Sequence, residues 1–363
     1  MSSNLTCLAK ARRLVIKVGS ALVTNNGEGL DLLAIAEWAR QIAELTNSGR
    51  QVVLVSSGAI ACGMQRLGWS KRPHAVNELQ AAAAVGQALL QQAWQRALGR
   101  SGRGTGQVLL AASDFERRES YLNARHTLET LLTWGVTPIV NENDSTATQE
   151  ITFGDNDALA AQVAVLLGAR LLVLLTDQEG LYTRDPKHPD AALVREVPDA
   201  SVLDEVDTAA AGSGWGSGGM RSKVVAAEMA RAGGSACVIA NGGRSGSIAA
   251  AIAGEQIGTR FPAKGSSPSA YKLWLRHALP TTGRIEVDGG ARKALEQDGA
   301  SLLPVGIKAV NGRFAAGDGV ELVDAKGVVF ARGITEMGHA ELKQQIGKRG
   351  ADLAVHRDRL VLL

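Results

Sequence analysis

Apolar runs of four or five residues alternate with helix-like patterns between Leu14 and Ala240. The five clearest runs are Leu14–Val18, Val52–Val55, Val136–Val140, Leu171–Leu175 and Ala236–Ala240. A strand that is buried on one face alternates apolar and polar residues, whereas a strand covered on both faces is apolar throughout. The pattern therefore predicts an α/β fold, with an open, mostly parallel sheet sandwiched by helices.

The segment after the first run shows how the helices are recognised. From Asp31 to Thr46 the apolar residues recur at helical spacing, and Asn47-Ser48-Gly49 ends the pattern. These residues predict one amphipathic helix that connects two neighbouring strands.

Composition narrows the class of protein. The chain has 363 residues, is 45% hydrophobic and has a formal net charge of +3, so it can build more than one core and does not demand an acidic partner. It contains no uncharged apolar run of 18 residues and no secretory leader pattern, so we expect a cytoplasmic protein without a membrane partner. The cysteines Cys7, Cys62 and Cys237 are too few and too far apart for a disulfide framework or a metal site.

Polar clusters follow each of the five apolar runs. They are Gly19-Ser20, Ser56-Ser57-Gly58, Asn141–Asp144, Thr176-Asp177 and Asn241-Gly242-Gly243. Ligands of open α/β sheets bind beyond the carboxyl ends of the strands. We therefore expect these clusters to face one crevice, together with Ile151–Asp157, which opens directly into an apolar helix.

A glycine-rich segment, Gly212–Gly219, precedes Met220-Arg221-Ser222-Lys223 and an alanine-rich helix. Glycine amides and a helix N-terminus favour phosphate, and Lys223 can place an ammonium on the same group. A flexible surface loop is the alternative. The segment also matches the dinucleotide fingerprint, but no strand leads into it and no acidic residue follows at the required distance.

Lys17 interrupts an apolar strand, so its ammonium must reach a polar crevice or an anion, unless the strand lies at an edge and the side chain extends to water. Ser57-Gly58 can form an anion-binding turn or an ordinary helix cap. Asp155 and Asp157 can cap their helix, bind a substrate ammonium, or orient Lys17 and Lys223.

None of the six histidines falls in these clusters. Phosphoryl transfer to a carboxylate does not need a general base, because the acceptor is already ionised at pH 7. It needs positioning and positive charge, which two lysines and glycine amides can supply.

The pattern changes after residue 262. Residues 263–280 have the composition of a linker, and after them come short strands with glycine turns. The expected strands are Arg284–Val287, Gly306–Val310, Val320–Val323 and Val328–Ala331, with hairpin turns expected at Asn311-Gly312 and Lys326-Gly327. The expected domains are residues 1–262 and a small β-rich domain over residues 281–363.

Taken together, the motifs resemble those of the amino acid kinase family, in particular its members that phosphorylate glutamate. They are Val15-Ile-Lys-Val-Gly-Ser20, Val55-Ser-Ser-Gly-Ala-Ile60, Asn141-Glu-Asn-Asp144, Phe153-Gly-Asp-Asn-Asp157, Leu175-Thr-Asp-Gln178 and Gly218-Gly-Met-Arg-Ser-Lys223. The tail resembles a PUA domain through Gly283–Asp288, Ser301–Pro304 and Gly317–Val320. Each motif is weak alone, and the ordered set is specific.

The resemblance implies that the γ-phosphoryl group of ATP is transferred, with Mg²⁺, to the side-chain carboxylate of L-glutamate, as the first step of proline biosynthesis. Lys17 and Lys223 would stabilise the transferring group and Asp157 would orient them. Ser57, Asp144, Asn156 and Asp155 would hold glutamate. ATP would be held by Lys17, Thr176, Asp177, Ser217, Gly218, Gly219, Met220, Arg221, Ser222 and Lys223. The nucleotide phosphates would carry Mg²⁺, so no protein residue is assigned as a metal ligand.

The resemblance also implies proline as a feedback inhibitor, glutamyl 5-phosphate reductase as a partner, and a homo-oligomer, dimer or tetramer. Thr152 departs from the basic residue of some family members, so a cationic role there is not expected. Two alternatives stay open: a family member with another acid as acceptor, and an RNA-associated protein acting through the tail. From Arg276 onward the tail has 13 Lys and Arg against 11 Asp and Glu, a net of +2, which is too thin for a basic RNA-binding patch.

Overall fold

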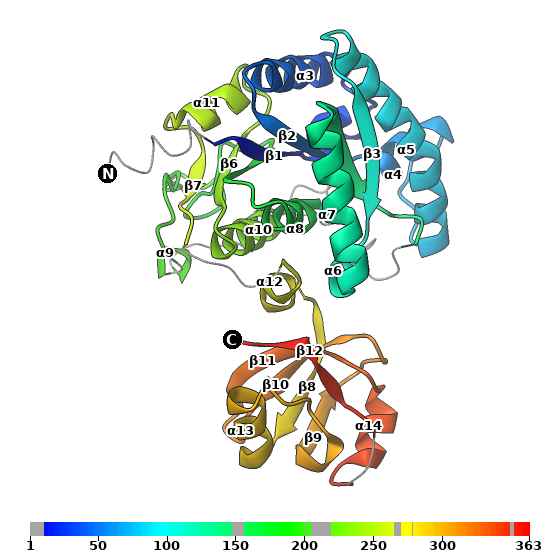
Figure 1. Ribbon diagram of the computed structural model, residues 1–363, viewed down its shortest axis with the longest axis vertical. Helices are drawn as coiled ribbons and strands as arrows, with labels where there is room; N and C mark the ends of the chain where they lie inside the picture. Colours follow the sequence, from blue (N-terminus) through cyan, green and yellow to red (C-terminus); the bar gives the residue numbers. More distant parts are fainter. Residues whose placement is uncertain are drawn as a thin grey trace. The chain divides into compact units, whose positions relative to one another are not determined.

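The structure is a computed structural model that describes residues 11–146, 156–199, 201–204, 219–264, 270–277, 279–348 and 352–363. The chain divides into two compact units, one ending at Ala270 and the other covering Tyr271–Leu363 (Figure 1). Each unit has its own sheet and its own core.

The first unit is built on a sheet whose described strands have the order β3-β4-β2-β1-β5-β6-β7. Neighbouring strands are parallel except for β6 and β7. The strands are β1 (Arg13–Val18), β2 (Gln51–Ser56), β3 (Thr105–Leu110), β4 (Thr137–Glu142), β5 (Leu171–Thr176), β6 (Ala236–Asn241) and β7 (Thr259–Phe261). The expected α/β class and the parallel sheet are confirmed.

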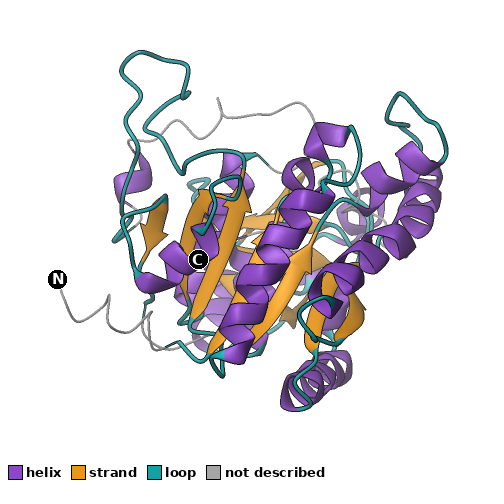
Figure 2. Cartoon of the chain, turned by 90° about the horizontal axis from the view of Figure 1, so that it is seen from above, coloured by secondary structure: helices purple, strands orange, loops and turns teal. Residues whose placement is uncertain are grey.

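Helices cover both faces of this sheet (Figure 2). The helical segments are α2 (Ser20–Val23), η1 (Asn25–Gly27), α3 (Leu32–Asn47), α4 (Ala59–Arg66), α5 (Val76–Gly99), α6 (Ala112–Glu116), α7 (Arg118–Thr133), α8 (Asn156–Leu166), α9 (Ser201–Asp204), α10 (Met220–Ala232) and α11 (Ser247–Ala253). The expected helix between β1 and β2 is α3, and the Asp31 carboxylate accepts a hydrogen bond from Ala34 N at its start.

One core of the first unit lies between one sheet face and helices α3, α5 and α11. Trp38 of α3 and Trp94 of α5 meet there with ring centroids 6.3 Å apart, and both side chains are fully buried. The opposite face of the central strands β1 and β5 packs against α8, where nearly every side chain is buried. Burial on both faces explains why these strands are apolar throughout.

The second unit contains a five-stranded sheet in the order β12-β11-β10-β8-β9. Its strands are β8 (Thr281–Val287), β9 (Ile307–Gly312), β10 (Gly319–Val323), β11 (Val329–Thr335) and β12 (Val355–Leu362), and its helical segments are α12 (Ala270–His277), α13 (Gly289–Gln297), η2 (Pro304–Gly306) and α14 (His339–Gln345). Among the described strands of this sheet, β8 and β10 pair in parallel and the other neighbours are antiparallel. Ile285, Val320 and Leu322 are among the residues of its core.

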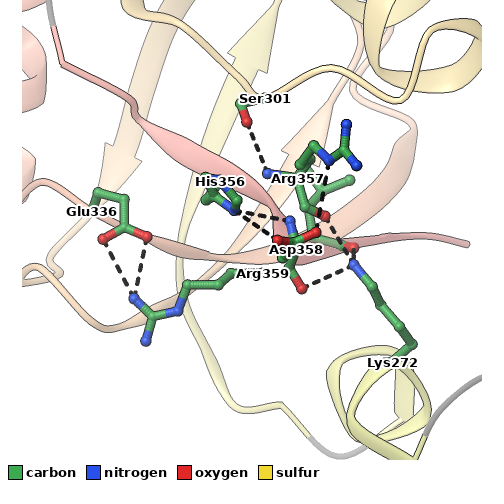
Figure 3. Close-up of polar contacts among 8 residues, drawn as sticks. Lys272, Ser301, Glu336, His356, Arg357, Asp358 and Arg359 are labelled. Atoms are coloured by element: carbon green, nitrogen blue, oxygen red, sulfur yellow. Dashed lines mark hydrogen bonds and ion pairs between the residues drawn. The ribbon is translucent and has the colours of Figure 1, made fainter. Parts of the chain in front are cut away.

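Helix α12 is tied to strand β12 by one lysine (Figure 3). Lys272 Nζ donates to the carbonyl oxygens of Arg357, Asp358 and Leu360 at 2.9, 2.9 and 2.5 Å. Burial lowers the pKa of Lys272, with the nearby Asp358 carboxylate opposing the shift. Three backbone acceptors thus hold one ammonium between the two elements.

Two expectations for this half of the chain need correction. Residues 270–277, expected to be linker, form α12. Asn311-Gly312 is not a hairpin turn, because both residues lie in β9 and pair with Arg284 and Gly283 of β8, which α13 separates from β9. The turn at Lys326-Gly327 does connect the antiparallel strands β10 and β11.

Within the described residues no helix is both long and apolar enough to cross a membrane. Cys62 and Cys237 are buried free thiols, and Cys7 lies outside the described residues.

Candidate functional site

Strands β1, β2, β4, β5 and β6 run parallel, so their carboxyl ends share one edge of the sheet. Helices α8 and α10 begin at Asn156 and Met220, and Asp157 in the first turn of α8 contacts both Lys17 of β1 and Lys223 in the first turn of α10. Two helix N-termini therefore converge on this edge, where their amide groups favour negative charge.

The centre of this convergence is Asp157. Its Oδ1 lies 2.6 Å from Lys17 Nζ, and its Oδ2 lies 3.1 Å from Lys223 Nζ. Ser222 Oγ donates to the same Oδ2 at 2.9 Å. The three charged side chains are 8% or less exposed and come from β1, α8 and α10. We call them the lysine–aspartate cluster.

The electrostatics of the cluster favour an ionised Asp157. Burial alone disfavours the charged form, but the charges of Lys17 and Lys223 outweigh it and hold the pKa of Asp157 well below its ordinary value. Within these three buried side chains, one carboxylate faces two ammonium groups.

Lys17 reaches this position because of its place in the strand. Its neighbours Ile16 and Val18 belong to the core on the α3 side of the sheet, so Lys17 projects to the opposite face, where α8 lies. A Cβ on Gly19 would lie 4.0 Å from Lys17 Nζ, which places the ammonium near the carboxyl end of β1. The alternative of an edge-strand lysine is wrong, because β1 pairs on both sides.

A second group of polar side chains joins three elements beside the cluster. Asn156 Nδ2 donates to Ser57 Oγ at 2.9 Å and to Asn141 Oδ1 at 3.0 Å, and Asn156 Oδ1 accepts from Glu142 N at 3.2 Å. Asn141 Nδ2 donates in turn to Gln87 Oε1 of α5 at 2.6 Å. We call Ser57, Gln87, Asn141 and Asn156 the amide network.

The turn before α4 needs its glycine. Gly58 is the N-cap of α4 with φ of 109°, a conformation that side chains rarely adopt. It follows Ser57, whose amide donates to Val18 O at 3.3 Å. Ser57 is therefore held between the end of β2 and the start of α4, against the end of β1.

Asp144 lies two residues beyond β4. Burial raises the pKa of its carboxyl to about 6, with the charge of Arg72 partly opposing the rise. A half-buried carboxylate whose ionisation is disfavoured in the free protein is suited to a cationic ligand, which would favour its charged form.

The remaining expected residues are placed as follows. Thr176, at the end of β5, is buried and donates to Asp177 Oδ1 at 3.0 Å, while Asp177 is exposed. Gly219 is the N-cap of α10, Met220 is buried and Arg221 is exposed. Asp155, Ser217, Gly218 and Thr152 lie outside the described residues, as do residues 212–218 of the glycine-rich segment.

Sequence reasoning did not single out Gln87 or Asn141 as site residues. Asn141 belongs to the polar cluster at the end of β4, and that position in the sequence is a usable signal. Gln87 is one of several glutamines on the alanine-rich helix α5, and nothing in its local sequence distinguishes it. Gln87 joins the amide network through Asn141, which lies 54 residues later in the sequence.

The arrangement suits an anion more than a metal ion. The part of the chain that the structure describes holds no group of three or more His, Cys, Asp or Glu placed to bind a metal. Asp157 is instead engaged by two lysines. Buried positive charge with two helix N-termini can stabilise a phosphoryl group during its transfer.

Comparison with known proteins agrees with this geometry. Residues 12–241 match the amino acid kinase family, and residues 283–356 match the PUA domain. Curated proteins named glutamate 5-kinase match over nearly the whole chain. That of Ralstonia nicotianae is 49% identical over 98% of this chain and 98% of the relative, and that of Variovorax paradoxus is 46% identical over 100% and 99%.

Among solved structures, the isopentenyl phosphate kinase of T. acidophilum superposes with a TM-score of 0.48 at 16% identity, over 69% of this chain and 99% of that chain. The family match covers most of the first unit, and the full-length relatives cover both units. The chain therefore belongs to the amino acid kinase family, with a PUA domain following the kinase domain.

Proposed function

We propose that this protein transfers the γ-phosphoryl group of ATP to the side-chain carboxylate of L-glutamate, forming glutamyl 5-phosphate and ADP. The observation that carries the proposal is the buried lysine–aspartate cluster at the sheet edge where ligands of such folds bind. Full-length similarity to proteins named glutamate 5-kinase supports glutamate as the acceptor.

In this reaction a carboxylate oxygen of glutamate attacks the γ-phosphorus, and the bond between that phosphorus and the β,γ-bridging oxygen breaks. The acceptor is ionised at neutral pH, so no proton has to be removed from it. Lys17 and Lys223 approach the transferring group from β1 and α10 and offset its negative charge. Asp157 forms ion pairs with both ammonium groups and so keeps them in position when no substrate is bound.

Mg²⁺ would neutralise charge on the nucleotide phosphates and be carried by them, since the described residues supply no cluster of metal ligands. The chain's own contribution is positional. Ser222 Oγ donates a hydrogen bond to Asp157, and Ser222 lies in the first turn of α10, which begins at Met220. This hydrogen bond fixes the position of the carboxylate relative to the amide groups at the start of α10.

For the acceptor we propose contacts from Ser57, Asn156 and Asp144, with Asp155 near the ammonium. The amide network already engages Asn156 with three protein partners, so its amide is fixed before glutamate arrives. Asp144 would ionise fully when the substrate ammonium is close. For ATP we propose Thr176, Asp177 and residues 217–223.

The experiment that tests the proposal traps the product. The protein is incubated with ATP, Mg²⁺ and hydroxylamine, which converts acyl phosphates to hydroxamates, and candidate acceptors are compared. Hydroxamate should form with L-glutamate and not with N-acetylglutamate or aspartate. Product with another acid and none with glutamate would refute the substrate assignment while leaving the kinase assignment in place.

Other partners follow from the product's chemistry and from the family resemblance. An acyl phosphate hydrolyses readily, so we propose a reductase as the consumer of glutamyl 5-phosphate in the cytoplasm. Proline as a feedback inhibitor and a homo-oligomeric state are proposals of the same kind. Inhibition of the hydroxamate assay by proline and the mass from light scattering test them.

A further inference from the structure

The hydrogen bonds of the amide network run in one direction, which is set by a backbone group. Glu142 N donates to Asn156 Oδ1 at 3.2 Å, and a backbone N–H can only donate. The oxygen and the nitrogen of a side-chain amide are nearly the same size, so this contact is what distinguishes them. The carboxamide of Asn156 therefore has one orientation, with Oδ1 toward Glu142 and Nδ2 away from it.

This direction continues from Asn156 to its neighbours. Asn156 Nδ2 has two hydrogens, and it donates to Asn141 Oδ1 at 3.0 Å and to Ser57 Oγ at 2.9 Å. Because Asn141 turns its oxygen toward Asn156, its Nδ2 faces Gln87 and donates to Oε1 at 2.6 Å. Turning Asn156 alone would place its nitrogen against a backbone N–H and its oxygen against another oxygen.

Ser57 ends this series of hydrogen bonds as an acceptor, which leaves its hydroxyl proton for another partner. Among the described residues no hydrogen bond uses that proton. Ser57 is 8% exposed and directly follows β2, at the sheet edge where ligands of such folds bind. A ligand that reaches this hydroxyl therefore meets a hydrogen-bond donor.

Asn156 offers a ligand the opposite kind of group. Both hydrogens of its Nδ2 are donated within the protein, and its Oδ1 accepts one hydrogen bond, so one lone pair remains. Asn156 can therefore accept a hydrogen bond from an ammonium group, but it has no hydrogen left for a carboxylate. Ser57 and Asn156 thus present a donor and an acceptor side by side, as the carboxylate and the ammonium of an amino acid require.

We propose that Ser57 binds a carboxylate of the acceptor as a hydrogen-bond donor, and that Asn156, Asn141 and Gln87 are positioning residues that set this direction. The inference rests on the proposed function, because it requires an acidic acceptor at this edge of the sheet. Asn141 and Gln87 act through Asn156 and do not touch the acceptor. A hydrogen bond to a charged group is among the stronger ones, so its loss should raise the KM for the acceptor.

Two isosteric substitutions separate the direction of the network from its charge. Asn156→Asp replaces Nδ2 with an oxygen that can only accept, so Ser57 donates its proton to this oxygen and no longer to the acceptor. The new carboxyl group accepts three hydrogen bonds, which favour its ionised form. Asn141→Asp adds the same charge, but Asn156 still donates to Ser57, because only the Gln87 amide has to turn.

Steady-state kinetics on the full chain, with the hydroxamate assay, compares these variants with and without Ser57→Ala. In wild type and in Asn141→Asp, Ser57→Ala should raise the KM for glutamate at least ~10-fold. In Asn156→Asp the same change should raise that KM by less than ~2-fold, because the donor has already been lost. The KM for ATP should stay within ~2-fold of wild type in all of them.

Gln87 is tested by a pair of substitutions of similar size. Gln87→Glu keeps an oxygen that accepts from Asn141, whereas Gln87→Met removes the acceptor. The KM for glutamate should rise by about 5-fold in Gln87→Met and by less in Gln87→Glu. A purely structural role for Gln87 would instead reduce the fraction of folded protein, so kcat would fall while the KM stayed unchanged.

Three results would overturn the proposal. They are additive effects of Ser57→Ala and Asn156→Asp, a rise in the KM for ATP in place of the KM for glutamate, and an unchanged KM for glutamate in Gln87→Met. If thermal melts show that Asn156→Asp does not fold, Asn156→Ala takes its place, because it also removes the donor to Ser57.

Failure of the proposed function gives a different result. Turnover of another acid by the wild type, with none of glutamate, refutes only the glutamate assignment. The same set of variants is then compared with that acid as the acceptor. Additive effects in a wild-type background that does phosphorylate glutamate refute only the direction assigned to the amide network.

Discussion

At the scale of single residues, Asp157 forms ion pairs with two lysines at once. Its carboxylate lies between the ammonium groups of Lys17 and Lys223, and all three side chains are buried. Removing one member of a buried ion network leaves the others uncompensated, which typically costs about 3–5 kcal/mol. Mutation here should therefore affect stability and catalysis together.

We expect Asp157→Asn to lower the free energy of unfolding by about 3–5 kcal/mol at pH 7 and to reduce kcat at least ~100-fold. Ser222→Ala removes a hydrogen bond from an uncharged donor to the same ionised carboxylate, without removing a charge, and should cost about 1.5–3 kcal/mol. Urea unfolding and the hydroxamate assay measure the two effects. Near-normal kcat in Asp157→Asn would show that the cluster is not part of the reaction.

The difference in unfolding free energy between wild type and Asp157→Asn should depend on pH in a defined direction. The pKa of Asp157 is lowered in the folded protein, so its stabilising contribution is fully present above the unfolded value of about 3.9. The contribution is lost as the pH falls through the lower, folded value. The gap in unfolding free energy between wild type and Asp157→Asn should stay constant from pH 8 to 5 and narrow only below about pH 4.

Asp144 should behave in the opposite way. Burial raises its pKa to about 6, so the folded protein holds a proton on Asp144 that the unfolded chain has lost between about pH 4 and 6. Stability therefore falls as pH rises through that window. Asp144→Asn should be about 1–2 kcal/mol more stable than wild type at pH 7.5 and equal to it at pH 4.

Arg72→Gln provides the contrast for Asp144, because the charge of Arg72 lowers the pKa of that carboxyl. This variant should be less stable than wild type at pH 7.5, and the deficit should disappear when it is combined with Asp144→Asn. A thermal-melt series over pH measures all three proteins. A pH-independent gain in Asp144→Asn would mean that the carboxyl is not buried as described.

At the scale of secondary-structure elements, α4 and α5 are packed backbone against backbone. A Cβ on Gly63 would lie 1.7 Å from Ala82 O, and one on Gly86 would lie 1.8 Å from Ala59 O. No side chain fits at either position without moving one helix. Because Gln87 follows Gly86 directly, this contact also positions the amide network.

We expect Gly86→Ala to destabilise the first unit by about 2–4 kcal/mol and to raise the KM for glutamate, because α5 must shift outward and carry Gln87 with it. Gly99→Ala lies on the same helix with nothing within 4 Å of the added methyl and should be neutral or slightly stabilising. Thermal melts and steady-state kinetics compare the two. Equal effects in the two variants would exclude close helix packing as the cause.

Sequence patterns predicted those elements whose own residues carry the signal. The central strands β1, β2, β4, β5 and β6 were found because they are apolar on both faces. Strand β3 was missed, because Thr105-Gly106-Gln107 is polar and the strand lies at the sheet edge. Strand β7 has only three residues, and β12 mixes charged and apolar residues.

The residues of the candidate site also divide into those that the sequence can identify and those that only the fold reveals. A buried lysine in β1 signals a need for an anion, but only the fold shows that the anion is Asp157, far along the chain in α8. The resemblance named Lys17, Asp157 and Lys223 together, and the structure places each ammonium within 3.1 Å of the carboxylate. Gln87 could not be found from sequence, since its partner Asn141 is reached only through the packing of α5.

At the scale of the whole molecule, the two units have separate cores and should respond separately to mutation. Lys272 belongs to the second unit, where its ammonium bridges three carbonyl groups of β12. Hydrogen bonds from a charged donor contribute roughly 1.5–3 kcal/mol each, although water can replace part of them at this partly exposed position.

We expect Lys272→Met to lower the stability of the second unit by about 1–2 kcal/mol and to leave the first unit unchanged. Hydrogen exchange followed by mass spectrometry should show faster exchange in β12 and the same exchange in β1 and β5. Lys293→Met, at an exposed position of α13, serves as the control. Faster exchange in both units would contradict their independence.

The Lys272 bridge also bears on how the protein is made. Arg357 is 85 residues downstream of Lys272, so at roughly 5–20 residues per second the ribosome delivers the acceptors about 4–17 s after the lysine. During that interval the Lys272 bridge cannot form, while β1 to β7 have all been synthesised. The kinase domain can thus complete its fold during translation, and the PUA domain closes as a later, separate event that is most exposed to chaperones and proteases.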